Sequence, residues 1–89
     1  MSNQETYFFA PFDNDKETIN WMNENGYTED RYVTVLSESG KVIRNAIEVT
    51  ASMIKEIATS LKVGTCCYYY GSPKVVHPIS TDDYIKIIT

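Results

Sequence analysis

The sequence predicts an α+β domain of the ferredoxin-like kind, a split βαβ arrangement in which two helices cover one face of an antiparallel sheet. Two segments carry helix-capping signals and apolar residues at helical spacing, and five short runs are β-prone. Their order along the chain is β-α-β-β-α-β-β, and the first six elements match that arrangement. A length of 89 residues suits one domain, so residues 1–89 are predicted to fold as a single unit.

The first strand and the first helix are predicted close together near the N-terminus. Residues 6–10 form a short apolar run that is β-prone. A helix is expected over about Lys16–Asn25, because Asn14 and Glu17, three residues apart, make a capping box. Gly26 suits the position just after a helix, where a left-handed backbone is common.

A β-hairpin is predicted in the middle of the chain. Residues 31–36 and 41–44 read as its two strands, and the turn between them contains Gly40. We expect the return strand to end between Arg44 and Ile47.

The second helix, over about Ala51–Lys62, has the clearest signal in the sequence. We expect Thr50 to cap it, although a start at Asn45 with Glu48 completing a capping box is an alternative. Gly64 is expected to stop it. Its apolar residues fall on one face: Met53, Ile54, Ile57, Ala58 and Leu61.

The last third of the chain is predicted to hold a second hairpin and a short helix. Residues 65–77 read as two strands around a turn at 71–73. Over residues 81–88 we favour a helix, because Ser80 and Asp83 are spaced as a helix cap. The alternative is a strand, since two of the isoleucines there alternate.

One cysteine and the single histidine form the only candidate catalytic pair. A turn centred on Ser72 would place Tyr70 opposite Lys74 and Cys67 opposite His77. A thiol beside an imidazole can act as a nucleophile with its base. Nothing in the sequence supplies an orienting third group or an oxyanion hole, so no enzymatic activity is predicted.

Metal and cofactor motifs are not recognisable in the sequence. One histidine and two adjacent cysteines cannot make the spaced ligand pairs of a zinc site. Asp13, Asp15 and Glu17 are spaced like the start of a calcium loop, but Thr18 stands where such a loop needs glycine. The four glycines are too dispersed for a phosphate-binding loop. We therefore predict no cofactor and no metal.

The net charge of −4 is unevenly distributed along the chain. Up to Asp30 the net charge is −6, and from Arg31 onward it is +2. A nucleic-acid-binding surface needs the opposite sign, so direct binding of DNA or RNA is not expected. A concentrated acidic segment instead favours a basic protein partner.

Composition bears on compartment and origin. Residues 1–5 lack the basic and apolar regions of a signal peptide, and no apolar run is long enough to span a membrane. We therefore expect a cytoplasmic protein that does not bind membranes. Residue types with AT-rich codons (Phe, Tyr, Met, Ile, Asn and Lys) total 34, against 13 for Gly, Ala, Arg and Pro. That bias indicates an AT-rich genome, as in many bacteriophages, plasmids and low-GC bacteria.

Together these observations predict a small acidic binding protein without enzymatic activity, of the kind that phages make early in infection. Its expected role is to inhibit a host nucleic-acid-binding or defence protein, in the sharpest form as a DNA mimic. The alternatives are a homodimeric structural or regulatory module and a small-ligand sensor. The predicted partner-binding residues are Asp13, Asp15, Glu17, Glu24, Glu29, Asp30, Tyr68 and Tyr70.

Overall fold

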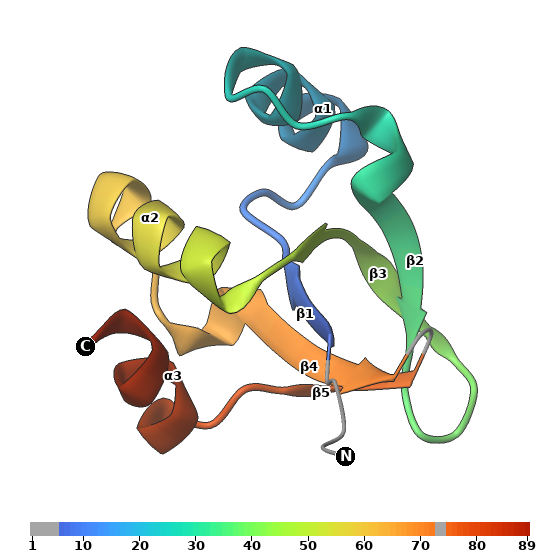
Figure 1. Cartoon of the computed structure of the whole chain (residues 1–89). Helices are drawn as coiled ribbons and strands as arrows, with labels where there is room; N and C mark the ends of the chain where they lie inside the picture. The colour runs from blue at the N-terminus through green and yellow to red at the C-terminus, as the bar shows by residue number, and fades with distance from the viewer. Residues whose placement is uncertain (1–5, 73–74) are drawn as a thin grey trace.

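A computed structural model describes residues 6–72 and 75–89 of the chain. Five strands close into a barrel in the order β1-β3-β2-β5-β4, and the helices lie outside it (Figure 1). The strands are β1 (Thr6–Phe9), β2 (Tyr32–Leu36), β3 (Val42–Val49), β4 (Tyr68–Ser72) and β5 (Val75–Pro78). The helices are α1 (Asp15–Glu24), α2 (Ala51–Leu61) and α3 (Thr81–Ile88), with short 3-10 helices η1 (Glu29–Arg31) and η2 (Thr65–Cys67).

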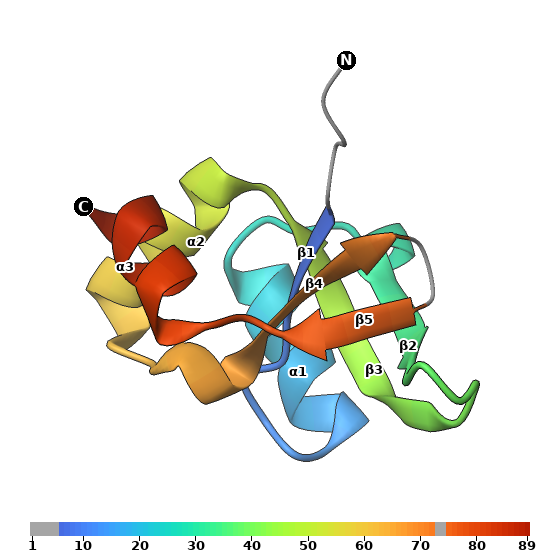
Figure 2. The same cartoon turned by 90° about the horizontal axis from the view of Figure 1, so that it is seen from below.

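The predicted open ferredoxin-like sheet with two helices on one face is wrong, because the fifth strand closes the sheet. β5 pairs antiparallel with β4 on one side and parallel with β2 on the other. The parallel contact is a single pair, Leu36 with Val75. Short-range patterns predicted β5 as the return of a hairpin, but its second neighbour depends on how the whole sheet curves. Figure 2 shows β5 running across the barrel beside β4.

The two long crossovers each pass over one strand. Helix α1 joins β1 to β2 with β3 between them, and α2 joins β3 to β4 with β1 between them. β1 is antiparallel to both of its neighbours, and β2 with β3 forms the predicted hairpin. That hairpin is confirmed, and its return strand runs beyond Ile47 to Val49.

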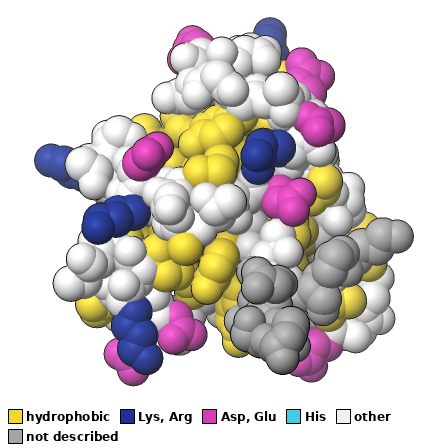
Figure 3. Space-filling model, viewed as in Figure 1, with side chains coloured by type: hydrophobic (Ala, Val, Ile, Leu, Met, Phe, Trp, Pro, Cys, Tyr) yellow, Lys and Arg dark blue, Asp and Glu magenta, His cyan; other side chains and the backbone are white. Residues whose placement is uncertain are grey.

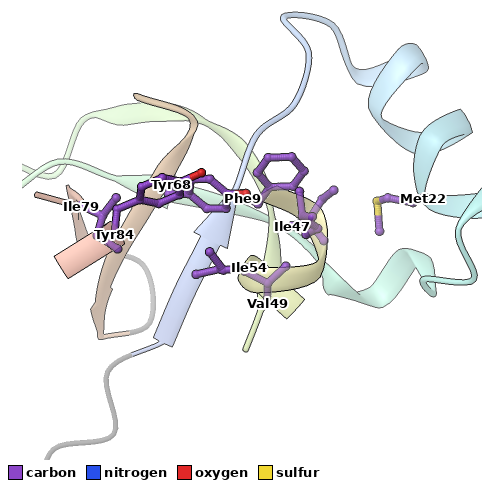
Figure 4. Packing of buried hydrophobic residues seen from close by; sticks show 9 residues of the cluster. Phe9, Met22, Ile47, Val49, Ile54, Tyr68, Ile79 and Tyr84 are labelled. Atoms are coloured by element: carbon purple, nitrogen blue, oxygen red, sulfur yellow. The ribbon is translucent and has the colours of Figure 1, made fainter. Parts of the chain in front are cut away.

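The barrel has an inner apolar cluster and an outer one. Adjacent residues of a strand point to opposite faces, so Phe8 belongs to the inner cluster and Phe9 to the outer cluster. The inner cluster is small, as five strands enclose little space; its buried members are Phe8, Ala10, Val35, Ala46 and Val76. The outer cluster lies beneath the helices (Figure 4); its buried members are Phe9, Met22, Ile47, Val49, Ile54, Ile57, Tyr68, Ile79 and Tyr84.

A chain of aromatic rings joins the helices to the barrel. Phe9 stacks on Tyr68 with a centroid distance of 4.9 Å and meets the edge of Trp21 at 5.6 Å. Tyr68 in turn lies 5.4 Å from Tyr84 of α3 (Figure 4). Such pairs add to the burial of apolar area, so this row of rings couples α1 and α3 through β1 and β4.

Local capping signals explain where the helices begin. The Asn14 side chain accepts the backbone N–H of Glu17, so Asn14 caps α1 as predicted. The Glu17 carboxylate accepts from the side-chain amide of Asn14, not from its backbone N–H as a capping box requires. Thr50 caps α2, which confirms it over the alternative start at Asn45. The Ser80 hydroxyl accepts the N–H of Asp83 and confirms a helix, not a strand, at the C-terminus.

The end of α2 differs from the expectation. Lys62 takes the left-handed backbone conformation that closes the helix, with φ of 54°, so Gly64 does not stop it. The chain then turns through η2, which removes residues 65–67 from the predicted strand.

The register of the second hairpin also differs from the expectation. Tyr70 lies opposite His77, so the predicted pairs of Tyr70 with Lys74 and Cys67 with His77 are wrong. The reason is that β4 continues through the predicted turn to Ser72, which pairs with Val75. The remaining part of the predicted turn, Pro73, lies outside the described residues, as does Lys74.

Candidate functional site

The net charge of the chain resides in residues 13–31, which we call the acidic lobe. This segment holds six carboxylates and two cations, while the rest of the chain holds six of each. It comprises α1, η1 and the residues beside them, and Figure 3 shows acidic side chains on this lobe at the top of the view. All six predicted acidic residues are exposed there: Asp13, Asp15, Glu17, Glu24, Glu29 and Asp30.

Most carboxylates of the acidic lobe are not neutralised by a neighbouring cation. Asp13 lies 3.8 Å from the guanidinium of Arg44. Four other acidic side chains of the lobe form no ion pair within residues 6–72 and 75–89: Glu17, Glu24, Glu29 and Asp30. Their charge therefore faces solvent.

Asp15 is different, because it joins the acidic lobe to the barrel. Its Oδ1 accepts hydrogen bonds from the Tyr32 hydroxyl at 2.5 Å and from Asn45 Nδ2 at 3.3 Å. Asn45 is itself oriented by the Thr34 hydroxyl, which donates to its Oδ1 at 2.6 Å. The bonds from Tyr32 and Asn45 lower the pKa of the Asp15 carboxyl below its ordinary value. Burial and the same bond to Asp15 raise the pKa of Tyr32 to about 12.

Beside this network lies a hollow of about 300 Å³, which we call the Arg44 hollow. Its wall combines one guanidinium with carboxylates, phenols, an amide and apolar side chains. The lining residues are Phe12, Asp13, Asp15, Tyr32, Ile43, Arg44, Asn45 and Tyr69.

Arg44 is held in place by the loop before α1. Its Nη2 donates to the carbonyl of Phe12 at 2.6 Å, and its side chain is 29% exposed. The pairing of β3 with β2 skips Ile43, since Val35 faces Arg44 and Leu36 faces Val42. Such a bulge changes the direction of the side chains beside it, so it helps to turn the beginning of β3 toward the hollow.

The two predicted tyrosines do not form a shared surface. Tyr68 is fully buried in the outer cluster, so it offers no surface to a partner. Tyr70 is half-buried and packs near the His77 ring at 5.8 Å. The placement of Tyr68 removes it from any partner-binding surface, while the acidic residues remain accessible.

The cysteine and histidine singled out in the sequence are not cross-strand neighbours. Cys67 lies in η2, and burial, with the neighbouring Cys66, raises the pKa of its thiol. His77 instead lies 3.4 Å from Glu38 through Nδ1 and Oε2, across to the turn of the first hairpin. In the described part of the chain, no group of three or more potential metal ligands comes together. No helix there is long and apolar enough to cross a membrane.

Sequence reasoning missed the Arg44 hollow. The signal was the polar pair Arg44 and Asn45 inside a β-branched, apolar run, which reads simply as the end of a strand. The approach of this pair to Asp15 depends on α1 folding back over the barrel, which no local sequence pattern encodes. No protein-family model, curated protein or solved structure matches the chain.

Proposed function

We propose that this protein is a non-enzymatic binding protein whose acidic lobe occupies a basic surface on a host protein. The supporting observation is the concentration of charge: residues 13–31 account for the entire net charge of −4, and the barrel with α2 and α3 is balanced. A surface of one sign attracts partners of the other sign and favours their association. The partner that suits this acidic lobe is a host protein with a basic surface that normally contacts nucleic acid. The protein would then be a phage-encoded inhibitor that competes with nucleic acid for this surface.

The spacing of charges on α1 supports mimicry of a nucleic-acid backbone in part. Glu17 and Glu24 are seven residues apart, which is about 10 Å along a helix. A DNA strand carries about three phosphates over that length. The lobe is therefore less densely charged than DNA, although Glu29 and Asp30 of η1 add to it. Binding by this lobe should consequently weaken with salt, but less steeply than the binding of DNA itself.

Two further observations weigh against an enzyme with a Cys67 nucleophile and against a homodimer formed by strand pairing. Burial raises the pKa of the Cys67 thiol, which disfavours the thiolate that a nucleophile requires. A homodimer formed by adding strand to strand has limited edge to use, because β1 and β4 are paired on both sides and only β2 and β5 meet through a single pair, Leu36 with Val75.

The test is a pull-down from bacterial cytosol with the tagged protein, analysed by mass spectrometry, with and without excess duplex DNA. We expect a nucleic-acid-binding protein that is retained by the wild type and displaced by the DNA. The double variant Glu17→Lys and Glu24→Lys should lose this partner while its circular dichroism spectrum stays that of the wild type.

The matched control is the double variant Asp82→Lys and Asp83→Lys. It changes the net charge by the same amount in the first turn of α3, outside the acidic lobe. If this variant loses the partner as completely as the α1 variant does, the binding reflects overall charge and the acidic lobe has no special role. A partner that DNA does not displace would rule out mimicry of nucleic acid.

A further inference from the structure

We propose that the Arg44 hollow binds a small zwitterion of the amino-acid class, through Arg44 for its carboxylate and Asp13 with Asp15 for its ammonium group. Asp13 and Asp15 belong to the acidic lobe, but this site does not depend on the proposed partner, because residues of β2, β3 and β4 also line the hollow.

The guanidinium of Arg44 has unused capacity to bind an anion. It carries five N–H donors. The structure gives it one hydrogen bond, to the Phe12 carbonyl, and one long ion pair of 3.8 Å to Asp13. The bond to Phe12 fixes the plane of the guanidinium, so its remaining donors are pre-organised for a carboxylate.

The hollow also carries negative charge in a fixed position. Both bonds that Asp15 accepts, from Tyr32 and from Asn45, end on the same oxygen, Oδ1. They hold the carboxylate ionised and oriented, as the lowered pKa of Asp15 reflects. Asp13 lines the same hollow and is fully exposed, so it can also contact a bound cation.

Charge and size together select the ligand class. Asp13 and Asp15 would repel a simple anion, and Arg44 would repel a simple cation. A zwitterion can place its carboxylate at Arg44 and its ammonium group at the aspartates. The volume of about 300 Å³ is at the lower limit of small-molecule sites, which suits an amino acid and is too small for a nucleotide cofactor. The wall of the hollow is mostly polar, and Tyr69 and Ile43 add only a little apolar surface, so a small or polar amino acid fits it better than a large apolar one.

The experiment is an NMR titration of the full ¹⁵N-labelled chain with individual common amino acids, and with acetate and ethylammonium as probes of single charge. We expect at least one amino acid to give saturable shifts at the amides of Asp15, Arg44 and Tyr69, with a dissociation constant in the roughly millimolar range or below. Acetate and ethylammonium should give no saturable shift at the same concentrations.

Three variants test whether binding is at this hollow. Arg44→Gln should weaken it roughly tenfold or more, as expected for a lost charge-assisted hydrogen bond. Ile43→Trp should block it by filling the hollow while keeping every polar contact, which covers the case that Arg44→Gln fails to fold. Arg31→Gln is the matched control, because Arg31 also donates to a backbone carbonyl, that of Glu48, but lies outside the hollow.

Two outcomes would overturn the proposal. One is that none of the amino acids gives a saturable shift at the hollow. The other is a shift that survives both Arg44→Gln and Ile43→Trp, or that acetate alone reproduces, because either would show that the two signs of charge do not act together there.

Discussion

The hydroxyl of Tyr32, the first residue of β2, donates a hydrogen bond of 2.5 Å to Asp15, the first residue of α1. This bond crosses from the charged part of the molecule to its barrel. It fixes the beginning of α1 over the middle of β3, since Asn45 donates to the same oxygen. The Asp15 carboxylate therefore helps to set both the position of the acidic lobe and the shape of the Arg44 hollow.

Replacing Tyr32 by phenylalanine should make the protein less sensitive to acid as well as less stable. The folded pKa of Asp15 lies below its ordinary value of 3.8, so its contribution is fully present above that pH and is lost as pH falls through the folded pKa. Tyr32→Phe removes the larger cause of the shift. Carboxyl ¹³C titration should show the pKa of Asp15 rising toward 3.8 in the variant.

The control for this prediction is Tyr69→Phe, which alters another tyrosine of the Arg44 hollow without touching Asp15. Its Asp15 titration should match that of the wild type. The same bond predicts an alkaline effect: the pKa of Tyr32 is raised to about 12, so stability from its protonated form is lost as pH rises from 10 through 12. An unchanged Asp15 titration in Tyr32→Phe would contradict the hydrogen bond.

Two buried tyrosines should respond oppositely to loss of their hydroxyls. The Tyr68 hydroxyl is buried without a hydrogen-bond partner, so Tyr68→Phe should leave stability unchanged or raise it by up to about 2 kcal/mol. Tyr84 donates to the Val63 carbonyl at 2.6 Å, so Tyr84→Phe should cost about 1 kcal/mol. Urea unfolding of both variants measures the contrast, and a destabilised Tyr68→Phe would reveal a partner for that hydroxyl.

Gly71 should be intolerant of any side chain. Its φ is +155°, and a Cβ added there would lie 2.2 Å from the backbone oxygen of Val75. Gly71→Ala should therefore force β4 and β5 apart and cost about 3 kcal/mol or more. Gly64→Ala is the control, because no atom lies within 4 Å of its added Cβ. Thermal unfolding of the two variants should separate them clearly, and equal melting temperatures would show that the β4–β5 contact is looser.

Amide hydrogen exchange should be slowest in β1 and faster where the barrel closes. β1 is paired along its length with β3 and β4, whereas β2 meets β5 through the single pair of Leu36 and Val75. Local opening begins where two strands share the fewest pairs. We therefore expect the amides of Phe8 and Phe9 to exchange more slowly than those of Leu36 and Val76. Exchange followed by NMR would contradict this if the two groups were equally protected.

The helices could be predicted to within a residue or two because their signals are local. Asn14, Thr50 and Ser80 each contact a residue three positions away, and these short-range bonds form in the structure as the spacing indicates. Closure of the barrel could not be predicted, because Leu36 and Val75 are distant in sequence. The register of the second hairpin was predicted wrongly because β4 continues to Ser72, which places the turn later in the chain than the glycine and proline indicate.

The candidate sites divide in the same way. That the acidic residues are exposed follows from their chemistry, since charged side chains are rarely buried. The burial of Tyr68 depends on the contacts of its ring with Phe9 and Tyr84, from opposite ends of the chain. The Arg44 hollow likewise needs four separate segments to meet, so only the folded chain shows it.

Because the acidic lobe carries all of the net charge on one side of an otherwise balanced body, the molecule has a permanent electric dipole. In the field of a basic surface such a molecule turns as it diffuses, and it arrives with α1 leading. A larger fraction of encounters then has the orientation that allows binding. The dipole therefore raises the rate of association more than it lengthens the lifetime of the complex.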